Sequence, residues 1–335
     1  MGEKSAESTV KAPLLAVLSF IVVALGAAAG KASLSFPLLI CAVLCAYIAN
    51  RPAGLPFALG AATLSGVAGY FTGGALFAVK CVVTIAVLGA VIFVCRRRGA
   101  GLFITSVAAG GAHLLMTAAF FAVSLYVEYK DVAVGARTVM REFYAAAGDM
   151  IRNMYRDGNT YKISDEDVNA LLSAITTMLP GIILAAWQAM GAALYFLMKL
   201  ICRLTGDTVD VKDEYRVPET PVIFFAVSLV ISLILSPFEG AKVARIAAVD
   251  ICIALSVSSA ICGIVAIVRK IKHPETVSLP DGTVVRRFPF LPVAAMVISV
   301  FINPFMPFGV AAIYGSALTV KNAVKRSINK DKKDG

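Results

Sequence analysis

Residues 179–202, LPGIILAAWQAMGAALYFLMKLIC, decide the fold of this chain, because only one charged side chain, Lys199, interrupts their apolar character. A run of this length crosses the roughly 30 Å hydrocarbon core of a bilayer as one helix. Eight further apolar runs lie at about 13–30, 33–49, 54–79, 81–95, 100–126, 221–237, 244–268 and 289–319. The series predicts an all-α, polytopic membrane protein of about 8–10 transmembrane helices, forming a single bundle domain over residues 1–335.

The composition of the whole chain indicates the same class. Of its 335 residues 59% are hydrophobic and only 16% are charged, and the mean hydropathy is +0.82. An average soluble domain carries about 25% charged residues, and one globular core is too small to bury so much apolar surface. This excludes soluble, disordered and disulfide-rich secreted proteins. The seven cysteines lie in or at the ends of apolar runs, which predicts small packing residues.

The distribution of positive charge predicts the orientation. Arg96-Arg97-Arg98 follow an apolar run and mark a cytoplasmic end, since loops on that side are rich in Lys and Arg. Counting back places the N-terminus in the cytoplasm, with the protein in the cytoplasmic (inner) membrane of a bacterium. Counting forward places residues 127–178 outside, and this segment holds six basic and eight acidic residues in a chain of net charge +10.

The basic tail, residues 321–335, conflicts with this count. Nine crossings would leave the tail outside, yet its six Lys and Arg residues favour the cytoplasm. Asn303-Pro304 and Pro307 interrupt the last apolar run, and proline bends or breaks a helix. A broken helix or a tight hairpin there would return the tail to the cytoplasm, which is our prediction.

Two polar segments between the runs have regular patterns. In residues 127–178 apolar side chains recur at helical spacing, and Ser164 followed by three acidic residues is typical of a helix N-terminus. We predict an extracytoplasmic insert of two amphipathic helices, the second ending at Met178, that serves as a connector or as a lid over a site. Thr276-Val277-Ser278-Leu279 and Thr283-Val284-Val285 have the composition of short strands and flank the turn residues Pro280-Asp281-Gly282. This pattern predicts a cytoplasmic hairpin-like loop over residues 271–287.

The sequence contains no nucleotide-binding or catalytic motif. Residues 26–33, GAAAGKAS, resemble a phosphate-binding loop, but three residues instead of four separate the glycines, and Ala32 follows the lysine where Ser or Thr is required. We therefore predict no ATPase, no enzyme activity, no cofactor and no metal site. The positive charge follows the membrane orientation, and no basic soluble domain suited to nucleic acid is present.

Polar side chains inside the apolar runs are candidate ligand-binding residues, because their burial in lipid is costly. They are His113, Trp187, Gln188, Asp250 and Asn303. We expect His113, Gln188 and Asp250 to line a polar pocket beneath the 127–178 segment, toward the outer leaflet. The alternative is that each makes an interhelical hydrogen bond that only fixes packing.

Several features follow one another in a distinctive order. A small-residue-rich span leads to Arg96-Arg97-Arg98, an outside helical insert follows, Leu179-Pro180 opens a span that ends at Lys199 and Arg203, and the penultimate span carries Asp250, Ser256 and Gly263. This order resembles the YybS-like (DUF2232) family of predicted bacterial membrane proteins. That family distantly resembles the substrate-binding subunits of energy-coupling-factor transporters. The second resemblance implies a bundle that binds one solute and docks, through Ala12 and Ala16, onto a transmembrane coupling protein with ATPase subunits.

We therefore predict a solute-binding or transport-related membrane protein without its own ATPase, which binds a small-molecule solute. The alternative is a membrane scaffold or envelope assembly factor with no ligand, in which the 127–178 insert and the basic tail dock partners. A ligand that stabilises the protein would favour the first function over the second.

Overall fold

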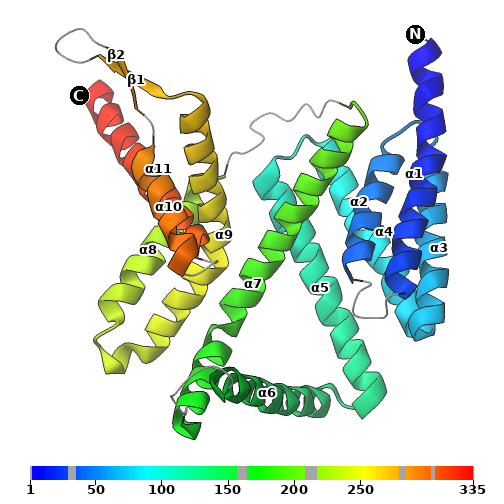
Figure 1. The fold of residues 1–335 in the computed structure, drawn as a ribbon, viewed down its shortest axis with the longest axis horizontal. Coiled ribbons are helices and arrows are strands. Elements are labelled where there is room, and N and C mark those ends of the chain that lie inside the picture. The colour runs from blue at the N-terminus through cyan, green and yellow to red at the C-terminus, as the bar shows by residue number, and fades with distance from the viewer. Residues whose placement is uncertain are drawn as a thin grey trace. The chain divides into compact units, whose positions relative to one another are not determined.

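The computed structural model describes residues 2–28, 35–156, 164–207, 217–278, 284–287, 289–302 and 306–334. Within these ranges the chain is helical almost throughout, and it divides into two compact units (Figure 1). Unit 1 comprises Met1–Val132 and Trp187–Glu214, and unit 2 comprises Ala133–Ala186 and Tyr215–Gly335. The predicted polytopic helical class is confirmed, and the single bundle domain expected over residues 1–335 stays a prediction beside this division.

One long helix, α7 (Asp165–Leu204), contributes to both units. Unit 1 also contains α1 (Gly2–Ala28), α2 (Ser35–Ala49), α3 (Leu55–Gly73), α4 (Ala75–Arg97) and α5 (Leu102–Tyr129). Unit 2 also contains α6 (Val132–Arg156), α8 (Glu219–Leu235), a short 3-10 helix (Glu239–Ala241), α9 (Lys242–Lys272), α10 (Phe290–Ile302) and α11 (Met306–Asp334). Among the described helices, α3, α4, α5, α7 and α9 are long and apolar enough to cross a membrane, and four shorter apolar helices accompany them.

The core of unit 1 is built around α2, whose residues 41–48 are all buried. This helix packs against α1, α3 and α4. The outside of the unit carries large apolar side chains instead: Phe71 of α3 is 83% exposed and Leu115 of α5 is 73% exposed. Such a surface suits lipid and not water. The seven cysteines are free, and each is buried or half-buried, as expected for packing residues.

Helices α3 and α4 form a helical hairpin with glycine at their contact. A Cβ added to Gly69 would lie 2.8 Å from the Sγ atom of Cys81, so the small residue lets the backbones approach closely. The turn is at Gly74, where a φ of 79° favours glycine. Lys80, where the sequence divided the two apolar runs, therefore lies inside α4.

In unit 2, α9 packs against α8 and α11 around a small apolar core. Gly263 of α9 faces the carbonyl oxygen of Ala311, and an added Cβ would overlap that oxygen. The predicted hairpin at residues 275–287 is confirmed, because β1 (Glu275–Ser278) pairs antiparallel with β2 (Val284–Arg287), with Glu275 opposite Arg287. Its turn residues 280–282 lie outside the described residues.

The last apolar run forms two helices, α10 and α11, as its prolines predict. The two helices pack against each other, which is the arrangement of a hairpin and not of a bent single helix. Asn303 and Pro304 lie between them, outside the described residues. The side of the membrane on which α11 ends stays a prediction.

Helix α7 is continuous through Pro180, so the prediction that the insert helix ends at Met178 was wrong. Proline breaks the helical hydrogen-bond pattern because it has no N–H and its ring displaces a carbonyl one turn earlier. The next N–H, of Gly181, donates to Oδ1 of Asp250 in α9 at 3.3 Å. A neighbouring helix thus supplies a polar partner beside the interruption, which is how membrane helices tolerate internal proline.

Candidate functional site

The structure brings together two of the polar residues predicted inside the apolar runs. The rings of His113 on α5 and Trp187 on α7 lie with their centroids 4.3 Å apart and their planes inclined by 55°. Nδ1 of His113 is buried without a hydrogen-bond partner among the described residues. Gly110, one turn before His113, contacts the backbone of Trp187 so closely that an added Cβ would overlap it. Gln188 follows on the same helix and is half-buried.

The remaining candidates are Asp250 and Asn303. Asp250 belongs to unit 2, where it is half-buried against Gly181 and accepts its N–H. This contact matches the alternative in which the polar residue fixes helix packing. Asn303 lies outside the described residues. His113 and Gln188 belong to unit 1 and Asp250 belongs to unit 2, so a pocket shared by these three residues stays a prediction.

The stripe of Ala12 and Ala16 is used within unit 1. Ala12 is 2% exposed and belongs to the same core cluster as Cys41 and Ala62, and Ala16 packs against that cluster. A partner helix would reach Ala12 only by displacing these neighbours. The stripe is therefore placed to pack α1 against its own unit, and a docking role for Ala16 stays a prediction.

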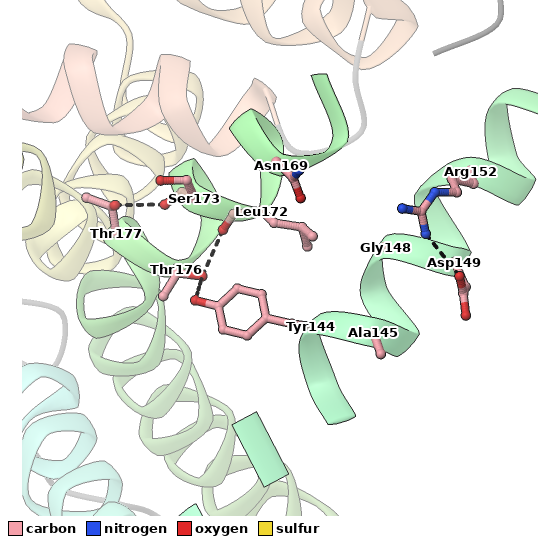
Figure 2. Close-up of a pocket in the computed structure, with 10 residues that line it drawn as sticks. All are labelled: Tyr144, Ala145, Gly148, Asp149, Arg152, Asn169, Leu172, Ser173, Thr176 and Thr177. Atoms are coloured by element: carbon pink, nitrogen blue, oxygen red, sulfur yellow. Dashed lines mark hydrogen bonds and ion pairs between the residues drawn. The ribbon is translucent and has the colours of Figure 1, made fainter. Parts of the chain in front are cut away.

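A polar hollow of unit 2 is a cleft of about 590 Å³ between α6 and the N-terminal part of α7 (Figure 2). Its wall on α6 is formed by Tyr144, Ala145, Gly148, Asp149 and Arg152, and its wall on α7 by Asn169, Leu172, Ser173, Thr176 and Thr177. We call it the α6–α7 cleft. Eight of the ten lining side chains are polar or glycine, in a chain that is mostly apolar.

Hydrogen bonds inside the α6–α7 cleft leave several polar groups available. The hydroxyl of Tyr144 donates to Oγ1 of Thr176 at 2.5 Å, and this links the two helices (Figure 2). Oγ1 of Thr176 in turn donates to the carbonyl of Leu172 at 2.8 Å. The side chains of Asn169 and Ser173 are exposed and have no hydrogen-bond partner among the described residues. An amide and a hydroxyl one turn apart on α7 are therefore free to bind a ligand.

An ionic bridge holds α6 near the start of α7. Arg152 lies 3.1 Å from the carboxylate of Asp149 and 3.0 Å from that of Asp165. The hydrogen bond to Asp165 and the pairing with both acids raise the pKa of Arg152, so the guanidinium stays charged. The predicted N-terminus of α7 is confirmed here, because Oγ of Ser164 accepts the N–H of Asp167 at 3.1 Å.

A second hollow, which we call the α7–α9 groove, lies on another side of the same segment of α7. Its volume is about 340 Å³. It shares Ser173 and Thr177 with the cleft, and α9 contributes Lys242 and Arg245. The remaining walls are apolar and comprise Ala170, Ala174, Met178, Ile246 and Val249. Asp250, the next residue along α9 after Val249, anchors α7 through Gly181 just beyond these walls.

A separate polar cluster, the Asp207 cluster, ties together three helix ends in unit 1. Oδ2 of Asp207, just after α7, lies 2.8 Å from Arg51 and 3.7 Å from Arg96. The hydroxyl of Tyr47 lies 2.6 Å from both this carboxylate and the hydroxyl of Thr205. Both guanidinium groups also lie about 5 Å from the Tyr47 ring centre. The ends of α2, α4 and α7 therefore meet at one polar cluster, and the side of the membrane on which it lies stays a prediction.

Sequence reasoning missed the lining of both hollows. The signal was present as hydroxyl and amide residues at helical spacing, Asn169, Ser173 and Thr176 or Thr177, on the helix that Ser164 begins. The sequence predicts only an amphipathic helix for this segment, and the partner helices turn this face of it into a cavity wall. Among the described residues no cluster of His, Cys, Asp and Glu is arranged to hold a metal ion.

The comparisons with known proteins add one match. Residues 14–279 fit the model of a family described as predicted membrane protein, DUF2232. No curated protein and no solved structure matches the chain. The matched region includes every helix from α2 to α9 and both hollows, and it extends over most of the chain. The chain therefore belongs to the DUF2232 family of predicted membrane proteins.

Proposed function

We propose that this protein binds a small polar solute in the α6–α7 cleft and serves transport without an ATPase or an enzymatic activity of its own. The observation that carries the proposal is the free amide and hydroxyl of Asn169 and Ser173 in a cleft of about 590 Å³. Ligand sites have volumes of about 300–1,000 Å³ and combine apolar walls with a few polar groups that fix orientation. The α6–α7 cleft has a volume in this range, and its lining is mostly polar, which suits a polar solute and not an apolar one.

The position of the cleft supports a role at the outer side of the membrane. With the N-terminus in the cytoplasm, as the arginine pattern predicts, α6 and the start of α7 lie outside the inner membrane. Helix α6 then covers the cleft as a lid, held by the Arg152 bridge and the hydrogen bond from Tyr144 to Thr176. Any energy for transport would come from a separate coupling protein with ATPase subunits.

The experiment is a thermal-unfolding screen of the purified protein in detergent, using small polar solutes and any small molecules that co-purify. We expect at least one solute to raise the melting temperature of the wild type. Asn169→Ala should weaken that effect about tenfold or more, because it removes hydrogen bonds to the ligand. Asn153→Ala is the matched control, since Asn153 is an exposed amide on α6 outside the cleft.

Two outcomes would overturn the proposal. The first is that no solute stabilises the wild type, and the second is that Asn169→Ala binds the solute as well as the wild type does. In the first case, co-purification with envelope proteins would instead favour the scaffold function. The ligand-binding role proposed for His113, Trp187 and Gln188 is tested in the same screen by His113→Ala, which should leave the solute effect unchanged if the cleft alone holds the ligand.

A further inference from the structure

The α7–α9 groove concentrates positive charge next to the proposed solute site. Lys242 and Arg245 lie one turn apart on α9 and both line the groove, and no lining residue is acidic. Among the described residues Lys242 has no ion-pair or hydrogen-bond partner. Arg245 donates one hydrogen bond, to the carbonyl of Ser236 at 3.2 Å, and a guanidinium has five N–H donors. One wall of the groove therefore carries net positive charge, and N–H donors of Lys242 and Arg245 remain available to a ligand.

These two cations lie where the orientation predicts few of them. The start of α9 follows one crossing after the cytoplasmic end of α7, so it is on the outer side, where Lys and Arg are depleted in short loops. The neighbouring insert, residues 127–178, has more acidic than basic residues. The predicted membrane orientation therefore does not account for Lys242 and Arg245. We infer that their positive charge serves a local function at the groove.

The rest of the groove matches a ligand with one charged end. Ser173 and Thr177 on α7 present hydroxyl groups from the opposite wall, and Oγ1 of Thr177 already donates to the carbonyl of Ser173 at 2.7 Å. The hydroxyl hydrogen of Ser173 remains as a donor for an anionic group. The other walls, including Met178 and Ile246, are apolar. A small anionic group next to a short apolar portion satisfies both kinds of wall.

We propose that the α7–α9 groove binds the anionic group, a carboxylate or phosphate, of the ligand. This inference rests on the proposed function, because Ser173 and Thr177 line both hollows and join the groove to the α6–α7 cleft. The cleft holds the neutral polar part of the solute, and Lys242 and Arg245 hold its charge. The solute class is then a small organic anion.

The test measures binding of defined anions to the intact protein. Inorganic phosphate, short mono- and dicarboxylates, and phosphatidylglycerol against phosphatidylcholine in mixed micelles are titrated at constant ionic strength, with the shift in melting temperature as readout. We expect a saturable shift for the wild type that Lys242→Gln with Arg245→Gln weakens about tenfold or more, since two charge-assisted hydrogen-bonding groups are lost. A shift from soluble anions identifies a free solute, and a shift from phosphatidylglycerol alone identifies a lipid headgroup as the source of the anion.

Matched variants keep this test decisive. Arg141→Gln removes an exposed charge of α6 outside both hollows and should bind anions as the wild type does. The pair Lys242→Arg with Arg245→Lys keeps the charge and should retain binding, which separates loss of charge from misfolding. The proposal is overturned if no anion shifts the wild type, or if the neutral pair still responds.

The two proposals fail in distinguishable ways. A solute effect that depends on Asn169 but not on Lys242 and Arg245 refutes the anion site and leaves the proposed function intact. An anion effect that depends on the two cations, without any solute effect at Asn169, refutes the α6–α7 cleft and leaves the anion site. If neither solutes nor anions shift the melting temperature of the wild type, both proposals are refuted.

Discussion

Among the described residues, Asp207 is the one carboxylate in the cluster where the ends of three helices of unit 1 meet. Its neighbours Arg51 and Arg96 have side chains that are 11% and 19% exposed, so the aspartate neutralises charge that water reaches poorly. Nε of Arg51 and an Nη nitrogen of Arg96 have no hydrogen-bond partner among the described residues, which increases the dependence on this one acid. Removing a partner from a buried ion pair is costly because the other charge stays buried.

Asp207→Asn should therefore lower the free energy of unfolding by about 2 kcal/mol, less than for a fully buried pair because Asp207 itself is partly exposed. The measurement is thermal or denaturant unfolding in detergent. Glu142→Gln, which removes an exposed carboxylate of α6, is the control and should change stability by less than about 0.5 kcal/mol. Equal stability of the two variants would mean that the cluster contributes nothing to the fold.

The Asp207 cluster also shows the limit of prediction from residues taken one at a time. From the sequence, Arg96 marks a predicted cytoplasmic end. Its partners were not identified, because Arg51 and Asp207 are 156 positions apart and neither belongs to a recognisable motif. Periodicity describes which residues share a helix face, and it contains no information on which distant loop that face meets.

At the scale of one element, the start of α7 depends on its N-terminal cap. Ser164→Ala should destabilise the first turn by about 1 kcal/mol, because the N–H of Asp167 loses its acceptor. Hydrogen exchange followed by mass spectrometry should show faster exchange at residues 165–168. Exchange in α9 serves as the internal reference and should not change. If residues 165–168 exchange as in the wild type, the cap contributes no stability to the wall of the cleft.

Contacts between helices depend on glycine in the same measurable way. Gly191 of α7 lies against the carbonyl oxygen of Ser106 in α5, and a Cβ there would overlap it. Gly191→Ala should therefore cost about 1–3 kcal/mol through overpacking. Gly111→Ala is the matched control in α5, because nothing lies within 4 Å of its added Cβ. That variant should be neutral or stabilised by up to about 1 kcal/mol.

Unfolding curves in detergent decide the comparison between the two glycine variants. A wild-type melting temperature for Gly191→Ala would mean that α5 and α7 do not touch as described. A large loss of stability for Gly111→Ala would mean that another group occupies the space beside Gly111 when the protein is solubilised. The sequence showed that small residues are abundant on these spans, but the positions at which backbones meet follow from tertiary packing alone.

Elements with strong local signals were predicted well. The cap at Ser164, the strand pair of residues 275–287 and the split of the last run all depend on side chains within a few positions of one another. The end of the insert helix was predicted wrongly, because Pro180 is a local stop signal that a distant residue, Asp250, offsets. Both hollows were missed for the same reason, since their walls come from different helices.

At the scale of the whole molecule, the orientation predicts which face a water-soluble reagent reaches. With Arg141→Cys in α6 and Lys321→Cys in α11, both at exposed positions, a membrane-impermeant maleimide should label intact cells only at position 141. Permeabilised cells should label at both positions. The seven native cysteines are buried or half-buried, so the unmodified protein gives the background. Labelling of position 321 in intact cells would place the tail outside.

The hairpin of α10 and α11 is the structural basis of that expectation. Two antiparallel helices return the chain to the face it left, so the tail ends on the side of β1 and β2 (Figure 1). With both helices counted as crossings, the predicted number of crossings becomes even, and a cytoplasmic tail then fits the orientation that the arginine pattern predicts. Hydropathy alone counted one run there, because it measures length and composition and does not detect a reversal of direction.

The continuity of α7 has a mechanical consequence. A helix of 40 residues is about 60 Å long, roughly twice the thickness of the hydrocarbon core. Pro180 is the point where the hydrogen-bond pattern of this long helix is weakest, so bending of the helix costs least there. The Asp250 carboxylate accepts the N–H of Gly181 and so restrains bending of α7 at this point. Tilting of the N-terminal part of α7, which carries Ser173, relative to α9 would therefore have to stretch or break the contact between Gly181 and Asp250 first.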